Sequence, residues 1–262
     1  MKRLLITGAA GNLGQMARKR LAGLAEVIRL SDVAMIEDLA ENEEFIQCDL
    51  SDESQVAAIV AGCDAIVHLG GVSVERTYDL IEAGNIRGVY NLYEAARSNG
   101  NPRIFFASSN HTIGYYRQTE HLTADMPLRP DTLYGVSKAY GEAMAKMYFE
   151  KFGVETAIVR IGSCVEKPDN RRALSTWLSF DDFTSLVRQV FDVPVLGCPI
   201  IWGVSNNAAS FWDNSAIAYI GWSPKDNAED FRTEVEANDP GDPDDPVNIY
   251  QGGFFTAEPI YK

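Results

Sequence analysis

Thr7-Gly8-Ala9-Ala10-Gly11-Asn12-Leu13-Gly14 is the stretch that decides the fold of this 262-residue chain. It follows Arg3–Thr7 (RLLIT), which has the composition of a buried strand, and it opens Asn12–Leu24, whose apolar residues recur at helical spacing. A strand, a glycine turn and a helix in this order begin the βαβ unit of a nucleotide-binding sheet. The stretch therefore predicts a parallel sheet with a phosphate site at the first turn.

The three glycines of this stretch have separate expected roles. Gly8 permits the tight turn, Gly11 lets the backbone approach a pyrophosphate, and Gly14 lets the helix pack closely on the strand. The start of the helix, at Asn12 and Leu13, offers unpaired amides and a partial positive charge to the phosphates. We expect a bound dinucleotide here.

Two aspartates refine the choice of cofactor. Asp32 closes the second predicted strand, where a carboxylate accepts hydrogen bonds from the adenosine ribose hydroxyls and repels a 2′-phosphate. The sequence thus favours NAD over NADP. Asp49, after the third predicted strand, is placed to meet the adenine edge, although a helix N-cap is an alternative role for Asp49 or Ser51.

Short aliphatic runs alternate with amphipathic segments over the first two-thirds of the chain, as in a doubly wound α/β fold. The predicted strands are Arg3–Thr7, Glu26–Leu30, Glu44–Gln47, Ala65–Leu69, Arg103–Ala107 and Thr156–Ile161, and the predicted helices are Asn12–Leu24, Ser54–Ala61, Asn85–Ser98 and Tyr134–Phe152. We expect a Rossmann-type parallel sheet in a single domain over residues 1–262. Residues 1–161 form its NAD-binding core, and residues 162–262 form mainly a small C-terminal substrate lobe.

The C-terminal third is less regular. Phe180–Phe191 is predicted as a helix and Val193–Gly197 as a strand. The segment Asn238–Pro246 (NDPGDPDDP) is rich in turn formers and acid, which predicts an exposed loop. The aromatic residues of Tyr250–Lys262 suggest that this last segment packs back on the body of the protein.

Composition narrows the partners. The formal net charge of −14 disfavours nucleic acid and anionic membrane surfaces, and an anionic substrate would need a local cation. The 4 cysteines form no close pairs and the 3 histidines no metal-binding motif, so we expect no metal. No apolar stretch has the length of a membrane span and no secretion signal is evident, so a cytoplasmic location is expected.

Catalytic chemistry is indicated by Tyr134 and Lys138, which stand at i and i+4 on one face of a predicted helix. A phenol with a pKa near 10 is a poor base, but an ammonium about 4 Å away contributes about 4 kcal/mol at an effective dielectric constant of about 20. Tyr134 is therefore expected to take a hydroxyl proton, while Lys138 also holds the nicotinamide ribose. Ser109, after the fifth predicted strand, is expected to orient the same substrate oxygen.

This combination resembles the extended branch of the short-chain dehydrogenase/reductase superfamily. The resemblance covers residues 1 to about 165 and includes His68-Leu69-Gly70-Gly71, where the commoner run is His-Leu-Ala-Ala, and Asn85 at the start of a helix. It implies further cofactor contacts from Leu50, Leu69, Gly70, Gly71, Asn85 and Ile161. Only about a hundred residues follow the sixth strand, which argues against a substrate with a nucleotide handle.

Three further stretches resemble the uronate dehydrogenase family: Ala107–Tyr116 (ASSNHTIGYY), Arg160–Cys164 (RIGSC) and Ser175–Ser179 (STWLS). That resemblance implies NAD⁺-dependent oxidation at C1 of cyclic galacturonate or glucuronate to the aldarolactone. It places Arg172 on the sugar carboxylate. The other implied substrate contacts are Ser73, Ser109, Asn110, His111, Tyr134, Ser163 and Phe255.

Several alternatives stay open at this stage. Sequence does not decide between Arg171 and Arg172 as the inward-facing cation, and His111 fits a core histidine as well as a ligand. A sugar epimerase or dehydratase that recycles bound NAD is the alternative activity. A non-catalytic NAD-binding scaffold is a third hypothesis, disfavoured because Tyr134 and Lys138 are both present.

A homo-oligomer, as a dimer or a multiple of dimers, is expected from apolar residues in excess of one core face on the helices Asn85–Ser98 and Tyr134–Phe152. The residues concerned are Val89, Tyr93, Tyr140, Met144, Met147 and Tyr148.

Overall fold

The computed structural model describes all residues from Met1 to Lys262 and places every strand in one sheet. Its 7 strands follow the order β3-β2-β1-β4-β5-β6-β7, and each neighbouring pair is parallel. The strands are β1 (Arg3–Thr7), β2 (Val27–Ser31), β3 (Glu43–Phe45), β4 (Ala65–His68), β5 (Arg103–Ser109), β6 (Thr156–Ile161) and β7 (Ile200–Gly203). The predicted doubly wound parallel fold is confirmed.

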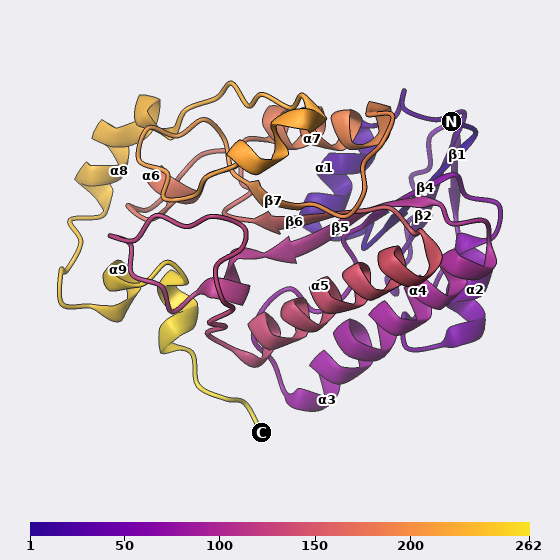
Figure 1. The fold of residues 1–262 in the computed structure, drawn as a ribbon, viewed down its shortest axis with the longest axis horizontal. Coiled ribbons are helices and arrows are strands. Elements are labelled where there is room, and N and C mark those ends of the chain that lie inside the picture. The colour runs from indigo at the N-terminus through magenta and orange to yellow at the C-terminus, as the bar shows by residue number, and fades with distance from the viewer.

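Helices cover both faces of the sheet (Figure 1). They are α1 (Asn12–Arg20), α2 (Glu53–Val60), α3 (Tyr78–Ile81), α4 (Gly88–Ser98), α5 (Leu133–Phe152), α6 (Ala173–Thr176), α7 (Phe180–Asp192), α8 (Arg232–Asn238) and α9 (Pro246–Ile249). A π-helical segment, Glu82–Arg87, leads into α4, and short 3₁₀ turns occupy Asn110–Ile113, Ser215–Ile220, Ala228–Phe231 and Gly253–Ala257. No helix is long and apolar enough to cross a membrane.

The two faces of the sheet bury separate cores because successive strand side chains point to opposite sides. Leu4 and Ile6 of β1 join the core under α1 and α7, whereas Leu5 joins the core under α2, α4 and α5. In β5, Phe105 packs edge-on against Phe183 of α7 on the first side. Central strands buried on both faces explain why they read as continuous apolar runs in the sequence.

Part of the predicted oligomer surface proves to be core. Val89, Tyr93 and Tyr148 are 3%, 0% and 2% exposed, because α4 and α5 pack against each other as well as against the sheet. Their apolar side chains are therefore not available to a partner, and that part of the sequence argument is wrong.

Most strand and helix boundaries shift by a few residues from those predicted, and one element is wrong. No strand forms at Val193–Gly197; β7 lies later, at Ile200–Gly203. Pro194 has no amide to donate to a sheet, and Arg103 holds the carbonyl of Val193 at 2.7 Å. Glu155 then accepts hydrogen bonds from the amides of Leu196 and Gly197, each at 2.8 Å, which fixes the segment as a loop.

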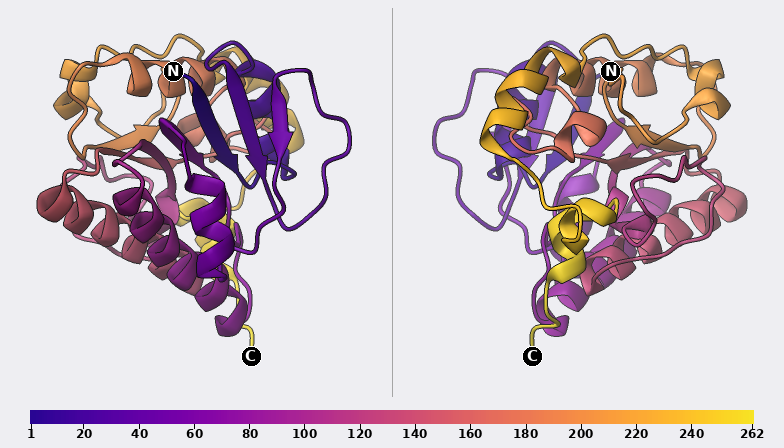
Figure 2. Two further views of the ribbon diagram at one scale, coloured as in Figure 1. Left: turned by 90° about the vertical axis from the view of Figure 1, so that its right-hand side faces the viewer. Right: turned by 90° about the vertical axis from the view of Figure 1, so that its left-hand side faces the viewer.

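The last segments of the chain, from α8 onward, lie at the carboxyl ends of the strands. In the right-hand view of Figure 2 these segments, coloured yellow, lie in front of the sheet. The predicted loop is found between the end of α8 and the start of α9. The predicted packing of the last segment holds only in part: Gln251, Gly252 and Gly253 are buried, but Ile260 and Tyr261 are exposed.

The strand order reverses between β1 and β4, which makes this point the topological switch of the sheet. The chain after β1 and the chain after β4 therefore lead to helices on opposite faces of the sheet, and a crevice lies between these connections at the carboxyl ends of the strands. Ligands of open parallel sheets bind in such a crevice, at the carboxyl ends of the strands. The functional site is built around it.

Candidate active site

The turn after β1 is set by contacts that leave no room for side chains. Gly8 has φ of 69°, and a Cβ on it would lie 2.7 Å from the amide nitrogen of Gly70. A Cβ on Gly14 would lie 2.1 Å from the carbonyl oxygen of Gly8. Gly11 is different: its Cβ would meet only that carbonyl oxygen, at 3.4 Å, an ordinary contact. The fold itself therefore requires glycine at positions 8 and 14 but not at 11.

The start of α1 faces this turn with its amides free of side chains. No side chain caps the helix and no acidic residue stands in its first turn, so its positive end is not neutralised locally. Asp32 lies beside the turn, where its carboxylate accepts hydrogen bonds from the amides of Ala10 at 3.0 Å and Ala34 at 3.1 Å. An open glycine, an uncapped helix start and an adjacent carboxylate fit the pyrophosphate and ribose of a dinucleotide.

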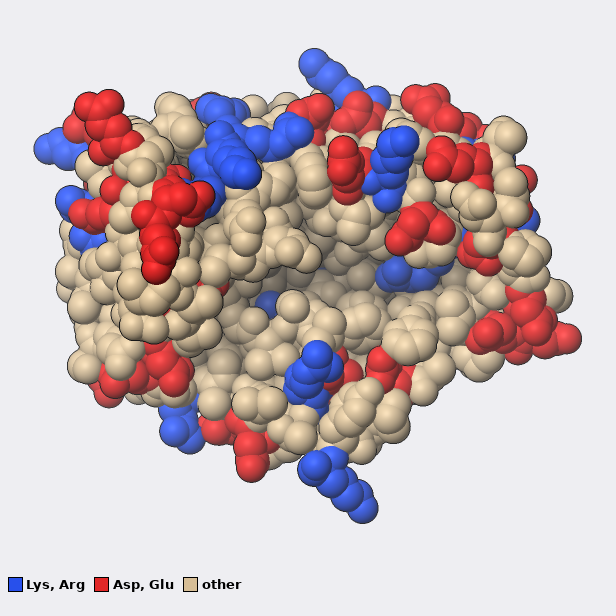
Figure 3. Space-filling model, turned by 180° about the vertical axis from the view of Figure 1, so that it is seen from behind, with Lys and Arg blue, Asp and Glu red and all other residues tan.

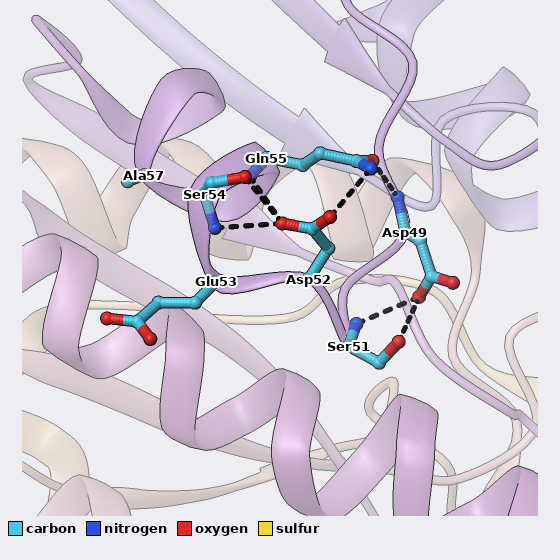
Figure 4. A pocket seen from close by; sticks show the side chains of 7 residues that line it. All are labelled: Asp49, Ser51, Asp52, Glu53, Ser54, Gln55 and Ala57. Carbon is cyan, nitrogen blue, oxygen red and sulfur yellow. Dashed lines mark hydrogen bonds between the residues drawn. The ribbon is translucent and has the colours of Figure 1, made fainter.

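Asp49 lies at the rim of an open depression of about 690 Å³ at the start of α2 (Figure 4). Its carboxylate accepts hydrogen bonds from the amide and the hydroxyl of Ser51, at 2.9 and 2.8 Å. The N-cap of α2 is Asp52, which corrects the alternative that Asp49 or Ser51 caps this helix. The carboxylates of Asp49, Asp52 and Glu53 make this depression unsuitable for phosphate.

Contacts from Leu50 and Asn85 hold the turn after β4 in place. Leu50 lies under Gly70, where a Cβ would come within 3.0 Å of its side chain. Asn85 accepts a hydrogen bond from the amide of Val72 at 2.7 Å and donates to the Val72 carbonyl and the Ser137 hydroxyl, each at 2.9 Å. The Asn85 amide is thus engaged inside the protein, where it ties Val72, directly after the Leu69–Gly71 turn, to α5.

Tyr134, Lys138 and Ser109 come together as the sequence predicts. They are 7%, 8% and 4% exposed, with Ser109 at the end of β5 and the other two in the first turns of α5. Glu75 accepts a hydrogen bond from the amide of Tyr134 at 2.8 Å, and Thr132 caps the helix at the amide of Gly135. The start of α5 is therefore fixed from two sides.

The electrostatics of this group differ from the sequence expectation. Burial raises the pKa of Tyr134 to about 12, although the neighbouring Ser109 hydroxyl acts to lower it. Burial also lowers the pKa of Lys138 to about 8. The ammonium lies 5.6 Å from the centre of the Tyr134 ring and donates to the carbonyl of Ala107 at 2.9 Å. The expected lowering of the phenol pKa is therefore wrong for the protein alone, because desolvation of the buried phenol is the largest influence on its pKa.

His111 lines the site next to the phenol. Its ring stacks on Phe255 with centroids 3.7 Å apart and meets Tyr134 edge-on at 5.8 Å. Its Nδ1 is hydrogen-bonded to Asp131 at 2.7 Å. Phe255 is half-buried and reaches the site from the C-terminal segment, as predicted.

The two adjacent arginines diverge. Arg171 turns outward, where its guanidinium meets Glu236 at 3.4 Å and the carbonyl of Asp239 at 2.7 Å. Arg172 turns inward and forms no ion pair: its Nε donates to the carbonyl of Gln251 at 2.6 Å and its Nη1 to the Ser163 hydroxyl at 3.4 Å. Burial lowers the pKa of Arg172 only to about 10, so it stays charged at neutral pH.

Two more predicted residues lie against Arg172. In the amide orientation that satisfies both of its polar atoms, Asn110 accepts a hydrogen bond from Arg172 Nη2 at 2.7 Å and donates to the carbonyl of Ile161 at 3.1 Å. The hydroxyl groups of Ser163 and Thr176 form a hydrogen bond with each other, with their oxygens 3.1 Å apart. Ser73 is exposed in the loop after β4 and makes no hydrogen bond within the chain.

Sequence reasoning missed three residues that support this site. Asp131 holds His111, Glu75 holds the start of α5, and Gln251 supplies a carbonyl to Arg172. Asp131 precedes the N-cap Thr132, so in the sequence it has the appearance of one more capping residue. Gln251 lies in an irregular segment far from the catalytic motif, and no local pattern marks it.

Figure 3 shows the molecule from behind, with a hollow crossing this face. Its walls are mainly uncharged, with a few basic atoms inside, and acidic groups are common along the rims. Although the protein has a net charge of −14, the walls of the hollow on this face are thus not acidic.

The comparisons agree with the fold and the site. Residues 4–176 match the NAD dependent epimerase/dehydratase family. Fold and site thus define an NAD-dependent oxidoreductase of this class, and the expected cofactor NAD is confirmed by the family.

Similar proteins of known activity identify a family within this class. A uronate dehydrogenase of Agrobacterium fabrum is 60% identical, covering 100% of this chain and 99% of its own, and one of Pseudomonas putida is 50% identical over 97% and 95%. The chain therefore belongs to the uronate dehydrogenase family. A mutant uronate dehydrogenase of Agrobacterium tumefaciens, solved in complex with NAD, superposes with a TM-score of 0.99 at 59% identity, covering 100% of this chain and 99% of that one. A glucuronic acid dehydrogenase of Chromohalobacter salexigens gives 0.97 at 50% identity, over 99% and 98%.

Substitution of Gly11 by alanine tests the fit of the glycine turn to a dinucleotide. Because a Cβ at this position meets nothing closer than 3.4 Å, Gly11→Ala is expected to fold with an unchanged Tm. Its affinity for NAD should fall at least about tenfold, since the methyl group intrudes on the approaching pyrophosphate. The measurement is the rise in Tm on addition of NAD.

Gly23→Ala is the matched control, because a Cβ there meets nothing within 4 Å and lies outside the turn. An unaltered response of Gly11→Ala to NAD would contradict the proposed place of the pyrophosphate.

Proposed function

We propose that this protein oxidises the C1 hydroxyl of cyclic galacturonate or glucuronate to the aldarolactone, with NAD⁺ as oxidant. The observation that carries the proposal is the inward guanidinium of Arg172, which faces the site with neutral partners only. A carboxylate is the natural complement of such a group, because it accepts two parallel hydrogen bonds and neutralises the charge. The similarity to uronate dehydrogenases supports the same substrate class.

The proposed cofactor site is the crevice between the turns after β1 and β4. Gly8, Gly11, Asn12, Leu13 and Gly14 would hold the pyrophosphate, and Asp32 the adenosine ribose, with Asp49 and Leu50 toward the adenine. Leu69, Gly70, Gly71, Asn85, Lys138 and Ile161 would hold or support the nicotinamide half. When bound, NAD⁺ supplies the acceptor for the hydride that leaves C1.

Tyr134 is the proposed base for the C1 hydroxyl proton, and Ser109 orients the same oxygen. In the protein alone the phenol is protonated, since burial raises its pKa to about 12. The Lys138 ammonium, 5.6 Å from the centre of the phenol ring, supplies a positive charge on this side of the site, and a nearby positive charge favours the ionised form of a phenol. Lys138 therefore assists proton transfer without sufficing alone, and the reaction depends on further positive charge beside the phenol.

The remaining polar residues would fix the sugar. Asn110 and Ser163 flank Arg172 and would share the carboxylate, while Ser73 and His111 would meet hydroxyl groups. Phe255 would cover the sugar ring from the C-terminal segment.

A panel of sugars is the direct test of the reaction. Galacturonate and glucuronate should raise NADH absorbance, while galactose and glucose should give at most about a hundredth of that kcat/KM. Tyr134→Phe should abolish turnover yet retain NAD binding, because only the hydroxyl is removed from a buried ring. Tight retention of NAD without net NADH release would instead indicate an epimerase or dehydratase.

The role of Arg172 is tested against its neighbour. Arg172→Met keeps an apolar stem but removes the guanidinium, so kcat/KM for the uronates should fall about a hundredfold or more. Arg171→Met is the control and should leave kcat/KM nearly unchanged, since Arg171 faces Glu236 and Asp239 outside the site. Equal losses in the two variants, or an unchanged preference for uronate over neutral sugar in Arg172→Met, would refute the assignment.

We also propose that the protein is a homo-oligomer, as a dimer or a multiple of dimers, paired through α4 and α5. Tyr90, Val136 and Met147 are large apolar side chains on these helices and are 46%, 50% and 43% exposed. Exposed apolar surface of this kind is typical of protein–protein contacts. Size-exclusion chromatography with light scattering should give a multiple of 28.9 kDa, and Met147→Lys should reduce it. A monomeric mass at micromolar concentration would contradict this expectation.

A further inference from the structure

Asp131 is enclosed by backbone on three sides. Its side chain has 0% exposure, and a Cβ on Gly114 or Gly252 would lie 1.8 or 2.0 Å from its Oδ2 atom. A Cβ on Gly135 would lie 3.2 Å from Oδ1. The start of α5, the turn after β5 and the C-terminal segment therefore all make room for this carboxylate. Burial of a carboxylate is costly unless hydrogen bonds satisfy it, so its partners carry information.

Those partners determine where the protons lie. Thr132 accepts a hydrogen bond from the amide of Gly135 at 3.1 Å, so its own hydroxyl proton is free to point at Asp131 Oδ1, 3.0 Å away. Asp131 Oδ2 lies 2.7 Å from His111 Nδ1. A carboxylate only accepts hydrogen bonds, so Nδ1 must carry a proton. In the neutral imidazole the lone pair is then on Nε2.

The Nε2 atom of His111 has no hydrogen-bond partner within the chain, and it is not among the protein's sealed buried atoms that lack partners, which are Glu75 Oε1 and Trp202 Nε1. The imidazole ring lies between Phe255 and Tyr134. Its one free polar atom is thus part of the lining of the active site.

We propose that Asp131 is a positioning residue that fixes His111 in the Nδ1–H tautomer, so that Nε2 accepts a hydrogen bond from a substrate hydroxyl. The proposal rests on the proposed function, because it needs His111 to face the sugar. It also orients the substrate: a carboxylate has no proton to give to Nε2, so the acidic end of the sugar must lie toward Arg172 and a hydroxyl toward His111.

Burial keeps this imidazole neutral. Burial lowers the pKa of His111, and the nearby Arg172 acts in the same direction, whereas Asp131 raises it. Tyr134, the other titratable group beside the ring, is protonated because burial raises its own pKa. The acceptor form of His111 is accordingly present at neutral pH.

The tautomer is measured directly by ¹⁵N NMR of the imidazole nitrogens at pH 7 in the full-length protein. Only 3 histidines are present, and the His111 signals are those lost in His111→Gln. We expect a protonated Nδ1 and an unprotonated Nε2 in the wild type. A protonated Nε2 would overturn the proposal, whether or not any Asp131 variant folds.

Asp131→Asn is the informative substitution. Thr132 donates toward Oδ1, so the amide oxygen should take that side and the NH₂ group should face His111. Because that group donates, His111 must accept at Nδ1 and carry its proton on Nε2. The NMR signals should exchange accordingly. KM for galacturonate should rise about 10- to 100-fold, with a smaller change in kcat and no change in the response of Tm to NAD.

Asp125→Asn is the matched control, since it removes the same charge at an exposed position of the same loop. It should leave the tautomer and KM unchanged. A reversed tautomer with an unaltered KM in Asp131→Asn would overturn the proposal, as would a raised KM with the wild-type tautomer. If the wild type does not oxidise uronates, the proposed function fails, but the tautomer measurement still decides the role of Asp131.

Discussion

The arrangement of the site depends on one close approach, in which the backbone of the turn after β1 meets the backbone of the turn after β4. A Cβ on Gly8 would lie 2.7 Å from the amide of Gly70, so the two turns touch only because neither carries a side chain there. This contact lies where the strand order reverses, and it sets the width of the crevice. This contact also fixes where the first turn of α1 and the Leu69–Gly71 turn lie relative to each other. Tyr134 and Lys138 reach the same crevice because α5 is anchored to the loop after β4 through Glu75 and Asn85.

Arg172 acquires its character from what surrounds it in a very acidic protein. The buried arginines Arg18, Arg29 and Arg160 are each paired with a glutamate. Arg172 donates to a carbonyl, a hydroxyl and an amide oxygen instead and forms no ion pair, although the buried Asp131 carboxylate is close enough to raise its pKa. Such a group is costly to retain unless an anion completes it, because neutral partners return only part of the solvation that is lost. Arg171, one residue earlier, shows the alternative: it is exposed to solvent and satisfied by acidic neighbours.

The sequence predicts features that depend on neighbouring residues, but it does not predict features that depend on residues far apart in the chain. The glycine turn, the pair Tyr134 and Lys138, and the alternation of strands and helices are all readable because each depends on neighbours within a few residues. β7 was misplaced because Pro194 and the contacts of Arg103 and Glu155 decide that segment, and both charged residues lie on other elements. The direction of the Tyr134 pKa was also missed, since spacing shows the ammonium but not the burial. Asp131 and Gln251 act across more than one segment, so no periodicity marks them.

Two pairs of titratable residues lie side by side in this site, and they differ in whether their members are in direct contact. His111 and Asp131 are in direct contact at 2.7 Å, and the bond removes freedom: one tautomer remains, and its free nitrogen has a fixed hydrogen-bonding sense. Tyr134 and Lys138 are held apart, with the ammonium directed to the carbonyl of Ala107, so burial leaves the pKa of the phenol high and that of the amine low. At neutral pH the imidazole of His111 and the phenol of Tyr134 are uncharged, because burial lowers the pKa of the first and raises the pKa of the second. In the proposed reaction the fixed pair would bind the sugar and the separated pair would take part in proton transfer, because a positive charge bound beside the phenol can still shift its ionisation.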